Sequence, residues 1–353
     1  MPCPFKNLKY PKITGINQPD NGCQLEKIKT PLFFISFDLK LRLPSPCWFH
    51  GEESREIDAF TGRPFKGNPA AVCLLDAPED AAAGDDWMQS VAKEFNAPVT
   101  AFLSRAVDVG SDGPTNGVAG PRFNIRWFTS VLEVNICGHA TLAAAHFLWS
   151  LDLVNGGVIY FSTKSGLLKA RKAISLNNSD TTNISLAKSD KFFIELDFPL
   201  FPVAECDTSE KPLIPDTLNG ASVINVLKFG ADEDLIVELS STKEILNLQP
   251  NFEEIQKCAR GSLAVTAPAP AGSEFDFFTH YFCPKFGVYE DHVCGSVHCA
   301  LAPYWSKKLG KNNLVAYMAS PRSGRLDLEL IAEARRICIR GEAVTVMTGT
   351  LLV

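Results

Sequence analysis

Two short segments of this chain pair a cysteine with a glycine in the same pattern. They are Cys137-Gly138-His139 and Cys294-Gly295-Ser296, and in both an alanine-containing helical stretch follows the glycine. A thiolate can remove a proton from carbon, and a thiol on the opposite face of that carbon can return one. Because a helix N-terminus favours the thiolate form, the pattern predicts a lowered pKa for both cysteines.

The stretches around these segments predict the elements that position the cysteines. Aromatic runs at 123–128 and 275–282 are typical of strands, and helices are expected over 137–148 and 294–306. A helix N-terminus presents unpaired N–H groups and partial positive charge, so it can hold a carboxylate. Two such sites in one chain predict two related halves that face one small anionic ligand.

Length, charge and cysteine content narrow the class of protein. A chain of 353 residues is longer than one typical core, which favours two domains. The formal net charge of −6 argues against nucleic acid or an anionic membrane as the partner, and no apolar run reaches the length of a membrane span. An odd count of 11 cysteines without an export signal predicts free thiols in the reducing cytoplasm.

The distribution of residue types predicts three regions. Residues 1–54 have strand-like character in one short patch only, and we expect an irregular extension there. From residue 57 onward, many short strand patterns surround one main helix in each half, which is typical of α+β domains. We expect domains at 57–198 and 199–353 with a cleft between them, and the last strand is a candidate for returning to the first domain.

Six motifs in order resemble the phenazine biosynthesis-like (PhzF) family. They are Asp58-Ala59-Phe60-Thr61, the stretch from Gly67 to Cys73, Arg126-Trp127-Phe128-Thr129, the stretch from Cys137 to Ala143, Glu290-Asp291 and Gly295-Ser296. The resemblance implies the fold of diaminopimelate epimerase, with two similar α+β domains, each a curled and mainly antiparallel sheet around a central helix. It also implies a homodimer and isomerase chemistry that needs no cofactor. Residues 1–54 have no counterpart in the family pattern.

The same resemblance implies roles for the candidate site residues. The catalytic candidates are Cys137, Cys294 and Asp291, and the substrate-binding candidates are Gly138, His139, Gly295 and Ser296. Cysteine before glycine at both positions looks like the diaminopimelate epimerases and proline racemases, in which two catalytic thiols precede glycines at facing helix N-termini. The implied substrate is a small carboxylate, derived from an amino acid.

Each of these residues also has a plain structural interpretation. The two cysteines can be small core residues, and Asp291 can cap the second helix. Asn68 and Gly67 are expected to build a turn, and Arg126 is expected to be a solvated or paired charge on a strand. His298 and Cys299 lie near Cys294 without a second ligand cluster, so no metal site is predicted.

One position departs from the family pattern where the acid–base group belongs. The family has a segment similar to Asn-Leu-Ser-Glu-Thr-Ala-Phe, whereas this chain has Val99 in place of the glutamate. Valine cannot carry a proton, so two functions stay open. The chain is an isomerase that uses its two thiols, or it has lost catalysis and binds a metabolite or another protein. Glu133 and Glu290 are candidates for a replacement carboxylate.

Overall fold

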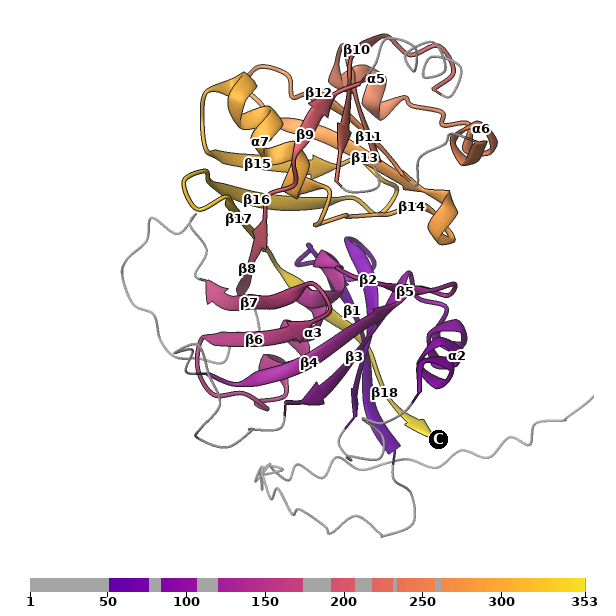
Figure 1. The fold of residues 1–353 in the computed structure, drawn as a ribbon, viewed down its shortest axis with the longest axis vertical. Helices are drawn as coiled ribbons and strands as arrows, with labels where there is room; N and C mark the ends of the chain where they lie inside the picture. Colours follow the sequence, from indigo (N-terminus) through magenta and orange to yellow (C-terminus); the bar gives the residue numbers. More distant parts are fainter. Residues whose placement is uncertain are drawn as a thin grey trace, which may run out of the picture. The chain divides into compact units, whose positions relative to one another are not determined.

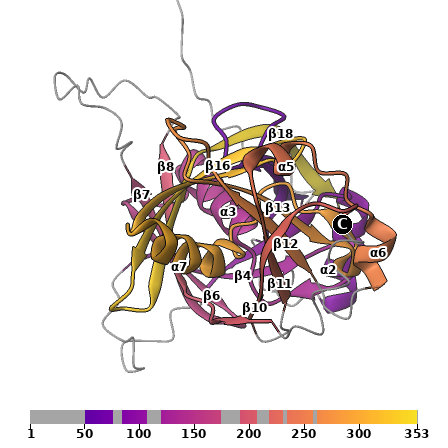
Figure 2. The same cartoon turned by 90° about the horizontal axis from the view of Figure 1, so that it is seen from above.

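The computed structural model describes residues 51–75, 84–106, 120–173, 192–206, 218–230, 234–257 and 262–352. All of these ranges belong to the larger of the two units into which the chain divides, and the fold given below is that of this unit. Strands surround a buried helix in each of two halves (Figures 1 and 2), as the sequence predicts for an α+β fold.

The first half consists of short strands and the two helices α2 and α3. Its elements are β1 (Gly51–Ala59), β2 (Asn68–Leu75), α2 (Asp85–Phe95), β3 (Val99–Arg105), β4 (Arg122–Phe128), β5 (Glu133–Val134), α3 (Gly138–Ser150), β6 (Val158–Thr163), β7 (Gly166–Ala173) and β8 (Phe193–Pro199). Sheet neighbours follow the order β1, β2, β3, β4, β6, β7 and β8, and the pairs β2–β3 and β4–β6 are parallel.

The second half repeats this topology. Its elements are β9 (Val203–Glu205), β10 (Val223–Phe229), β11 (Asp234–Leu239), α5 (Thr242–Leu246), α6 (Phe252–Lys257), β12 (Leu263–Pro268), β13 (Phe277–Cys283), η2 (Pro284–Phe286), β14 (Val288–Glu290), α7 (His298–Leu309), β15 (Asn313–Met318), β16 (Gly324–Ile331), β17 (Arg336–Gly341) and β18 (Ala343–Leu352). The order here is β10, β11, β12, β13, β15, β16 and β17, with β11–β12 and β13–β15 parallel. The parallel pairs therefore occupy equivalent places in both halves.

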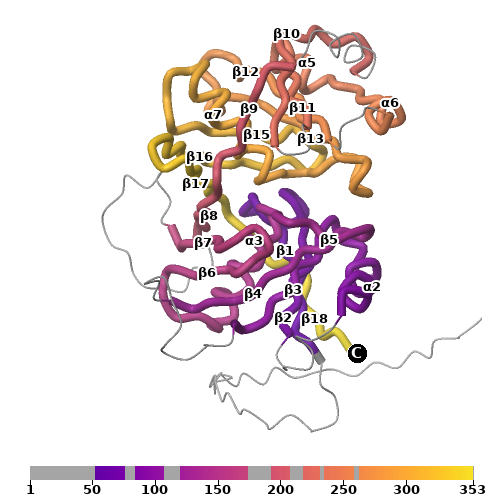
Figure 3. Tube along the Cα trace, in the orientation of Figure 1, coloured from indigo at the N-terminus to yellow at the C-terminus, as the bar shows by residue number. Residues whose placement is uncertain are grey.

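The chain passes between the two halves twice, and Figure 3 lets the reader follow both crossings. β9 follows β8 along the chain but pairs with β10 of the second half. β18 follows β17 but pairs with β1 of the first half. β8 and β17 pair with each other and join the two sheets. The domain boundary expected between residues 198 and 199 stays a prediction.

The helices carry the central part of each core. Every residue of α3 from Gly138 to Trp149 is buried, and the helix contacts β1, β2, β3, β8 and β18. The helix predicted over 294–306 begins only at His298, because the preceding turn is tighter. There His298 N–H donates to the carbonyl of Gly295 (3.2 Å) and Cys299 N–H to that of Ser296 (3.0 Å), which is an i to i+3 pattern.

The sheet also begins earlier than the sequence suggests. β1 starts at Gly51, so residues 51–54, which were expected in the irregular extension, pair with residues 349–352 of β18. Glu52 and Ser54 are buried although they are polar, and this polar composition hides the strand. The remainder of the predicted extension lies outside the described residues.

Candidate functional site

All seven predicted site residues line one cavity of about 370 Å³. Cys137, Gly138 and His139 come from the start of α3, and Asp291, Cys294, Gly295 and Ser296 come from the segment between β14 and α7. The cavity is in the size range of small-molecule sites, which are typically about 300–1,000 Å³. Residues from both halves are thus brought together, as the paired motifs predict.

The two glycines lie in direct backbone contact. A Cβ placed on Gly138 would be 3.0 Å from the Cα of Gly295, and one placed on Gly295 would be 3.2 Å from the Cα of Gly138. Contacts this short are tighter than most Cβ contacts in proteins, so a side chain at either position would require the facing backbone to shift by a few tenths of an ångström. The glycines therefore let the start of α3 and the turn before α7 face each other closely.

Cys137 is the N-cap residue of α3 and is held by its own helix. Its carbonyl accepts hydrogen bonds from the Thr141 amide (3.1 Å) and the Thr141 hydroxyl (2.6 Å). Its Sγ lies 3.4 Å from Nδ1 of His139. The thiol and an imidazole nitrogen are therefore adjacent at the N-terminus of α3, close enough for proton exchange.

Cys294 is fixed in a comparable way from the second half. Its carbonyl accepts a hydrogen bond from Nδ1 of His298 (2.7 Å), and its Sγ lies 3.4 Å from the hydroxyl of Ser296. Since the carbonyl can only accept, Nδ1 of His298 carries the proton, and Nε2 of this buried histidine has no partner among the described residues.

The lowered thiol pKa expected from the helix N-termini is wrong. Burial raises the pKa of Cys137 and of Cys294, and the nearby charge of Asp291 raises both further. Backbone N–H groups oppose this shift, from Ala140 and His139 at Cys137 and from Val297 at Cys294, but they do not outweigh desolvation. Both thiols are therefore protonated in the free protein at neutral pH.

His139 contributes an unpaired nitrogen to the cavity wall. The side chain is buried, and Nε2 has no hydrogen-bond partner among the described residues. Burial lowers the pKa of His139, and the charge of Asp291 only partly opposes this. A neutral imidazole with an unsatisfied buried nitrogen is suited to meet a polar group of a ligand.

Asn68 is a site residue that the sequence interpretation assigned only to a turn. It is fully buried and reaches from β2 to the other half, where Nδ2 donates to Oδ1 of Asp291 (2.5 Å) and to the carbonyl of Val293 (3.1 Å). Asp291 also donates its amide to the carbonyl of Tyr281 (2.9 Å). These bonds hold Asp291 beside the cavity, and it does not cap α7, whose N-cap residue is Val297.

Val99 lines the cavity at the start of β3. The position of the missing glutamate therefore faces the site, and the substitution places an apolar surface there. Cys283 and Tyr281 of β13 line the cavity as well, and neither was predicted. The alternation of side chains along the aromatic strand was the signal that could have indicated them, since residues two apart share a face.

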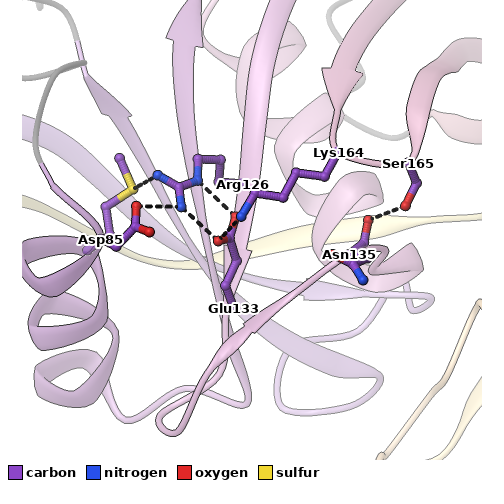
Figure 4. Close-up of polar contacts among 7 residues, drawn as sticks. Asp85, Arg126, Glu133, Asn135, Lys164 and Ser165 are labelled. Carbon is purple, nitrogen blue, oxygen red and sulfur yellow. Dashed lines mark hydrogen bonds and ion pairs between the residues drawn. The ribbon is translucent and has the colours of Figure 1, made fainter.

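Glu133 also lines the cavity but is already fully engaged, as Figure 4 shows. Arg126 donates to both carboxylate oxygens (2.8 and 2.7 Å), Lys164 forms a second ion pair, and Arg126 also contacts Asp85. The hydrogen bond from Arg126 lowers the pKa of Glu133, with Lys164 adding to the effect. Glu133 therefore stays ionised and is a poor proton donor.

Glu290, the other candidate for a replacement carboxylate, is not among the residues that line the cavity. It pairs with Nδ1 of His280 (2.6 Å), whose Nε2 bonds the carbonyl of Ile245 (3.2 Å).

Within the described ranges, no cluster of three or more His, Cys, Asp or Glu side chains could hold a metal ion. The helices described there include none long and apolar enough to cross a membrane.

Comparison with known proteins identifies the family to which the chain is similar. Residues 57–349 match the family model for phenazine biosynthesis-like protein. The chain is 39% identical over 302 residues to an uncharacterized isomerase of Halalkalibacterium halodurans, a match that covers 84% of this chain and 97% of that protein.

Two solved structures show how far the fold is shared. A PhzF-family phenazine biosynthesis protein from Enterococcus faecalis aligns with a TM-score of 0.70 at 29% identity, over 86% of this chain and 100% of that one. A hydroxyproline epimerase from Agrobacterium vitis with bound trans-4-hydroxy-L-proline aligns with a TM-score of 0.52 at 11% identity, over 87% and 94%. The second likeness concerns the fold alone, which is the epimerase-type fold that the sequence predicts.

Proposed function

This chain belongs to the phenazine biosynthesis-like family, and we propose that it is a cofactor-independent isomerase acting on the α-carbon of a small carboxylate. One observation carries the proposal. The cysteine–glycine segments of the two halves line the same cavity, and their glycine backbones are in contact. This arrangement offers a thiol from each half to a single ligand.

The proposed reaction moves one proton off the α-carbon and another onto its opposite face. Neutral His139 first accepts the proton of Cys137, whose Sγ lies 3.4 Å from Nδ1. The negative charge of Asp291 favours the resulting imidazolium. The thiolate then takes the α-proton, and Cys294 donates its own proton from the other side. After product release, the proton held by His139 passes through solvent to the Cys294 thiolate, which restores the starting state.

Backbone donors serve the charge that develops during this transfer. The N–H groups at Gly138 and Gly295 lie at the start of α3 and in the turn before α7, where they can hold the substrate carboxylate and its enolate-like form. Such groups need no cofactor to stabilise negative charge. The epimerase that shares the fold has an amino-acid-derived ligand in its structure, which supports a substrate of this class.

The test is incorporation of solvent deuterium at the α-carbon of amino and hydroxy acids, read by mass spectrometry. We expect exchange with the parent chain and loss of racemisation in Cys137→Ser and in Cys294→Ser, because each thiol serves one face. Cys338→Ser is the control, since Cys338 is a buried thiol that does not line the cavity. Full racemisation in either site variant would end the two-thiol mechanism.

One observation favours a second function, that of a binding protein without catalysis. Val99 lines the cavity where the family has its acid–base glutamate, and the pKa of both thiols is raised by burial. Under this alternative the parent shows no exchange with any ligand, whereas Val99→Glu gains it. Activity in the variant together with none in the parent would identify a lapsed glutamate-dependent isomerase.

The family resemblance also leads us to propose a homodimer in the cytoplasm. The net charge of −6 supports a small-molecule partner over nucleic acid. Sedimentation velocity of the full chain tests the dimer directly.

A further inference from the structure

We propose that the cavity selects an α-amino acid zwitterion with an uncharged, apolar side chain, and that Asp291 and Val99 set these two preferences. The proposal rests on the isomerase function for one point, which is the position of the ligand α-carbon between the two thiols. The preferences themselves follow from the charges and surfaces of the cavity wall and can be measured by binding alone.

The charges in the wall argue for a ligand that carries both signs. None of the described lining residues is a lysine or an arginine, whereas Glu133 and Asp291 are both present. A ligand carboxylate must therefore rely on neutral donors, among them the N–H groups beside Gly138 and Gly295 and the unpartnered Nε2 of His139. A ligand with only negative charge would meet carboxylates without a side-chain cation to balance it.

Asp291 is the carboxylate that remains open to a ligand cation. Glu133 is already bonded to Arg126 and Lys164. On Asp291 the side-chain bond from Asn68 reaches Oδ1, and no hydrogen bond from the described residues reaches Oδ2. A carboxylate oxygen accepts up to two hydrogen bonds, so Oδ2 retains its capacity for an ammonium group.

The place of Asp291 relative to the thiols identifies which ligand group it meets. Asp291 lines the same cavity as Cys137 and Cys294, and it lies three residues before Cys294 in the chain. A ligand α-carbon between these sulfurs carries its amino group on the same carbon. An α-ammonium group is therefore the cation that reaches Asp291, and a charge-assisted hydrogen bond results.

Part of the remaining wall is apolar, and we assign this part to the ligand side chain. It is formed by Pro98, Val99, Leu132, Ile136, Phe286 and Val288, and the rest of the lining includes the polar residues Thr129, Asn135, Tyr281 and Ser296. A charged side chain placed against this surface would lose its water without gaining a partner, and that costs free energy. Valine at position 99 extends the apolar surface where a glutamate would have brought a charge. The wall therefore favours ligands such as leucine and phenylalanine over glutamate and lysine.

Calorimetric titration of the full chain tests both preferences with defined probes. We expect binding of leucine, and binding about tenfold or more weaker for 2-hydroxy-4-methylpentanoate, which lacks the ammonium, and for leucinamide, which lacks the carboxylate. Glutamate and lysine should also bind more weakly than leucine, by a similar factor. Alanine, which has little side chain to place on the apolar wall, serves as the reference ligand.

Two variants assign the preferences to single residues. Asp291→Asn should weaken the binding of leucine about 10- to 100-fold, so that leucine no longer binds more tightly than the hydroxy acid. Asp327→Asn is the matched control, because Asp327 pairs with Arg325 and does not line this cavity. Val99→Thr keeps the side-chain shape but replaces a methyl group with a hydroxyl, so it should weaken the binding of leucine and leave the binding of alanine nearly unchanged.

The outcomes separate this proposal from the isomerase function. Hydroxy-acid binding as tight as that of leucine, glutamate as the tightest ligand, or no amino-acid binding at all would overturn the proposal. If leucine binds with the stated preferences but incorporates no solvent deuterium at its α-carbon, the zwitterion preference is supported and the isomerase function is overturned. Exchange confined to hydroxy acids would support the isomerase and overturn the zwitterion preference.

Discussion

Asn68 and Asp291 lie in different halves of the fold and share a hydrogen bond of 2.5 Å. The same amide of Asn68 also donates to the carbonyl of Val293, so one buried side chain fixes two points of the segment that carries Asp291 into the cavity. Asn68 is a positioning residue, because it acts on the site through Asp291.

Replacing Asn68 should therefore damage both stability and the site. We expect Asn68→Ala to lower the free energy of unfolding by about 1–3 kcal/mol, since a buried acceptor loses its donor. Asn68→Asp should be worse, because it sets a second carboxylate beside Asp291. Urea unfolding measures the change, and Asn124→Ala, which removes an exposed bond to Ser104, is the control. Equal effects at both positions would contradict the bridging role.

The contact between the two glycines predicts that adding one methyl group at either position lowers the stability of the fold. Gly138→Ala and Gly295→Ala should each destabilise the chain by about 1–3 kcal/mol, because overpacking displaces backbone that cannot yield cheaply. Gly157→Ala is the control, since nothing lies within 4 Å of a Cβ there. Thermal unfolding of the three variants measures the difference, and a silent Gly138→Ala would show that the segments separate freely.

The raised thiol pKa values predict the order of alkylation. Burial raises the pKa of Cys338 to about 11, and it raises that of Cys294 well above its usual range. As the pH is increased with iodoacetamide present, Cys338 should therefore be modified before Cys137 and Cys294, since the thiolate is the reactive form. Peptide mapping by mass spectrometry gives the order. Rapid modification of Cys137 at pH 7 would instead reveal a thiolate in the free protein.

His298 predicts a loss of stability in mild acid. Burial lowers its pKa from 6.5 to about 4, so below pH 6.5 the unfolded chain binds a proton that the folded chain does not. Its contribution is complete above pH 6.5 and declines as the pH falls toward 4, by about 3 kcal/mol in all.

The variant His298→Asn isolates this contribution. Asparagine keeps a donor for the carbonyl of Cys294 but does not titrate, so urea unfolding at pH 7 and pH 5 should give a smaller difference for the variant than for the parent. An unchanged difference would mean that the acid sensitivity arises elsewhere.

Arg126 is expected to secure the segment that forms one wall of the cavity. Arg126→Met leaves the partly buried Glu133 with Lys164 alone, and we expect a loss of about 1–3 kcal/mol in unfolding free energy. Arg105→Met is the control, since the Arg105 guanidinium lies over the ring of Phe123 and forms no ion pair with a carboxylate of the described residues. Comparable losses in both variants would remove the special role of the network in Figure 4.

The parts of the fold that could be predicted are those for which a short stretch of sequence has a recognisable pattern. β6 (Val158–Thr163) is one of these short strand patterns: its run of apolar and aromatic residues is typical of a strand, its buried residues Ile159 and Phe161 lie two apart, and Gly166 closes the following turn. The seven site residues could be brought together because the repeated motif implied equivalent places in two halves. β16 carried the same kind of signal in Leu326, Leu328 and Leu330, which alternate with polar residues, but it was not predicted.

The parts that could not be predicted depend on contacts far along the chain. The partner of Asn68 is 223 positions away, and nothing near Asn68 in the sequence indicates it. The pKa of Cys137 was assigned in the wrong direction because the helix N-terminus is a local feature, whereas burial comes from both halves together. Desolvation of a thiol is visible only once the packing is known.

The pairing of β18 with β1 of the first half has a consequence for biosynthesis. β1 pairs with β18, which follows every other described strand along the chain, so the first sheet has an open edge until that strand emerges from the ribosome. An open edge can pair with the edge of another chain. We therefore expect nascent chains stalled before β18 to aggregate or to recruit chaperones, even though the first half has been completely translated.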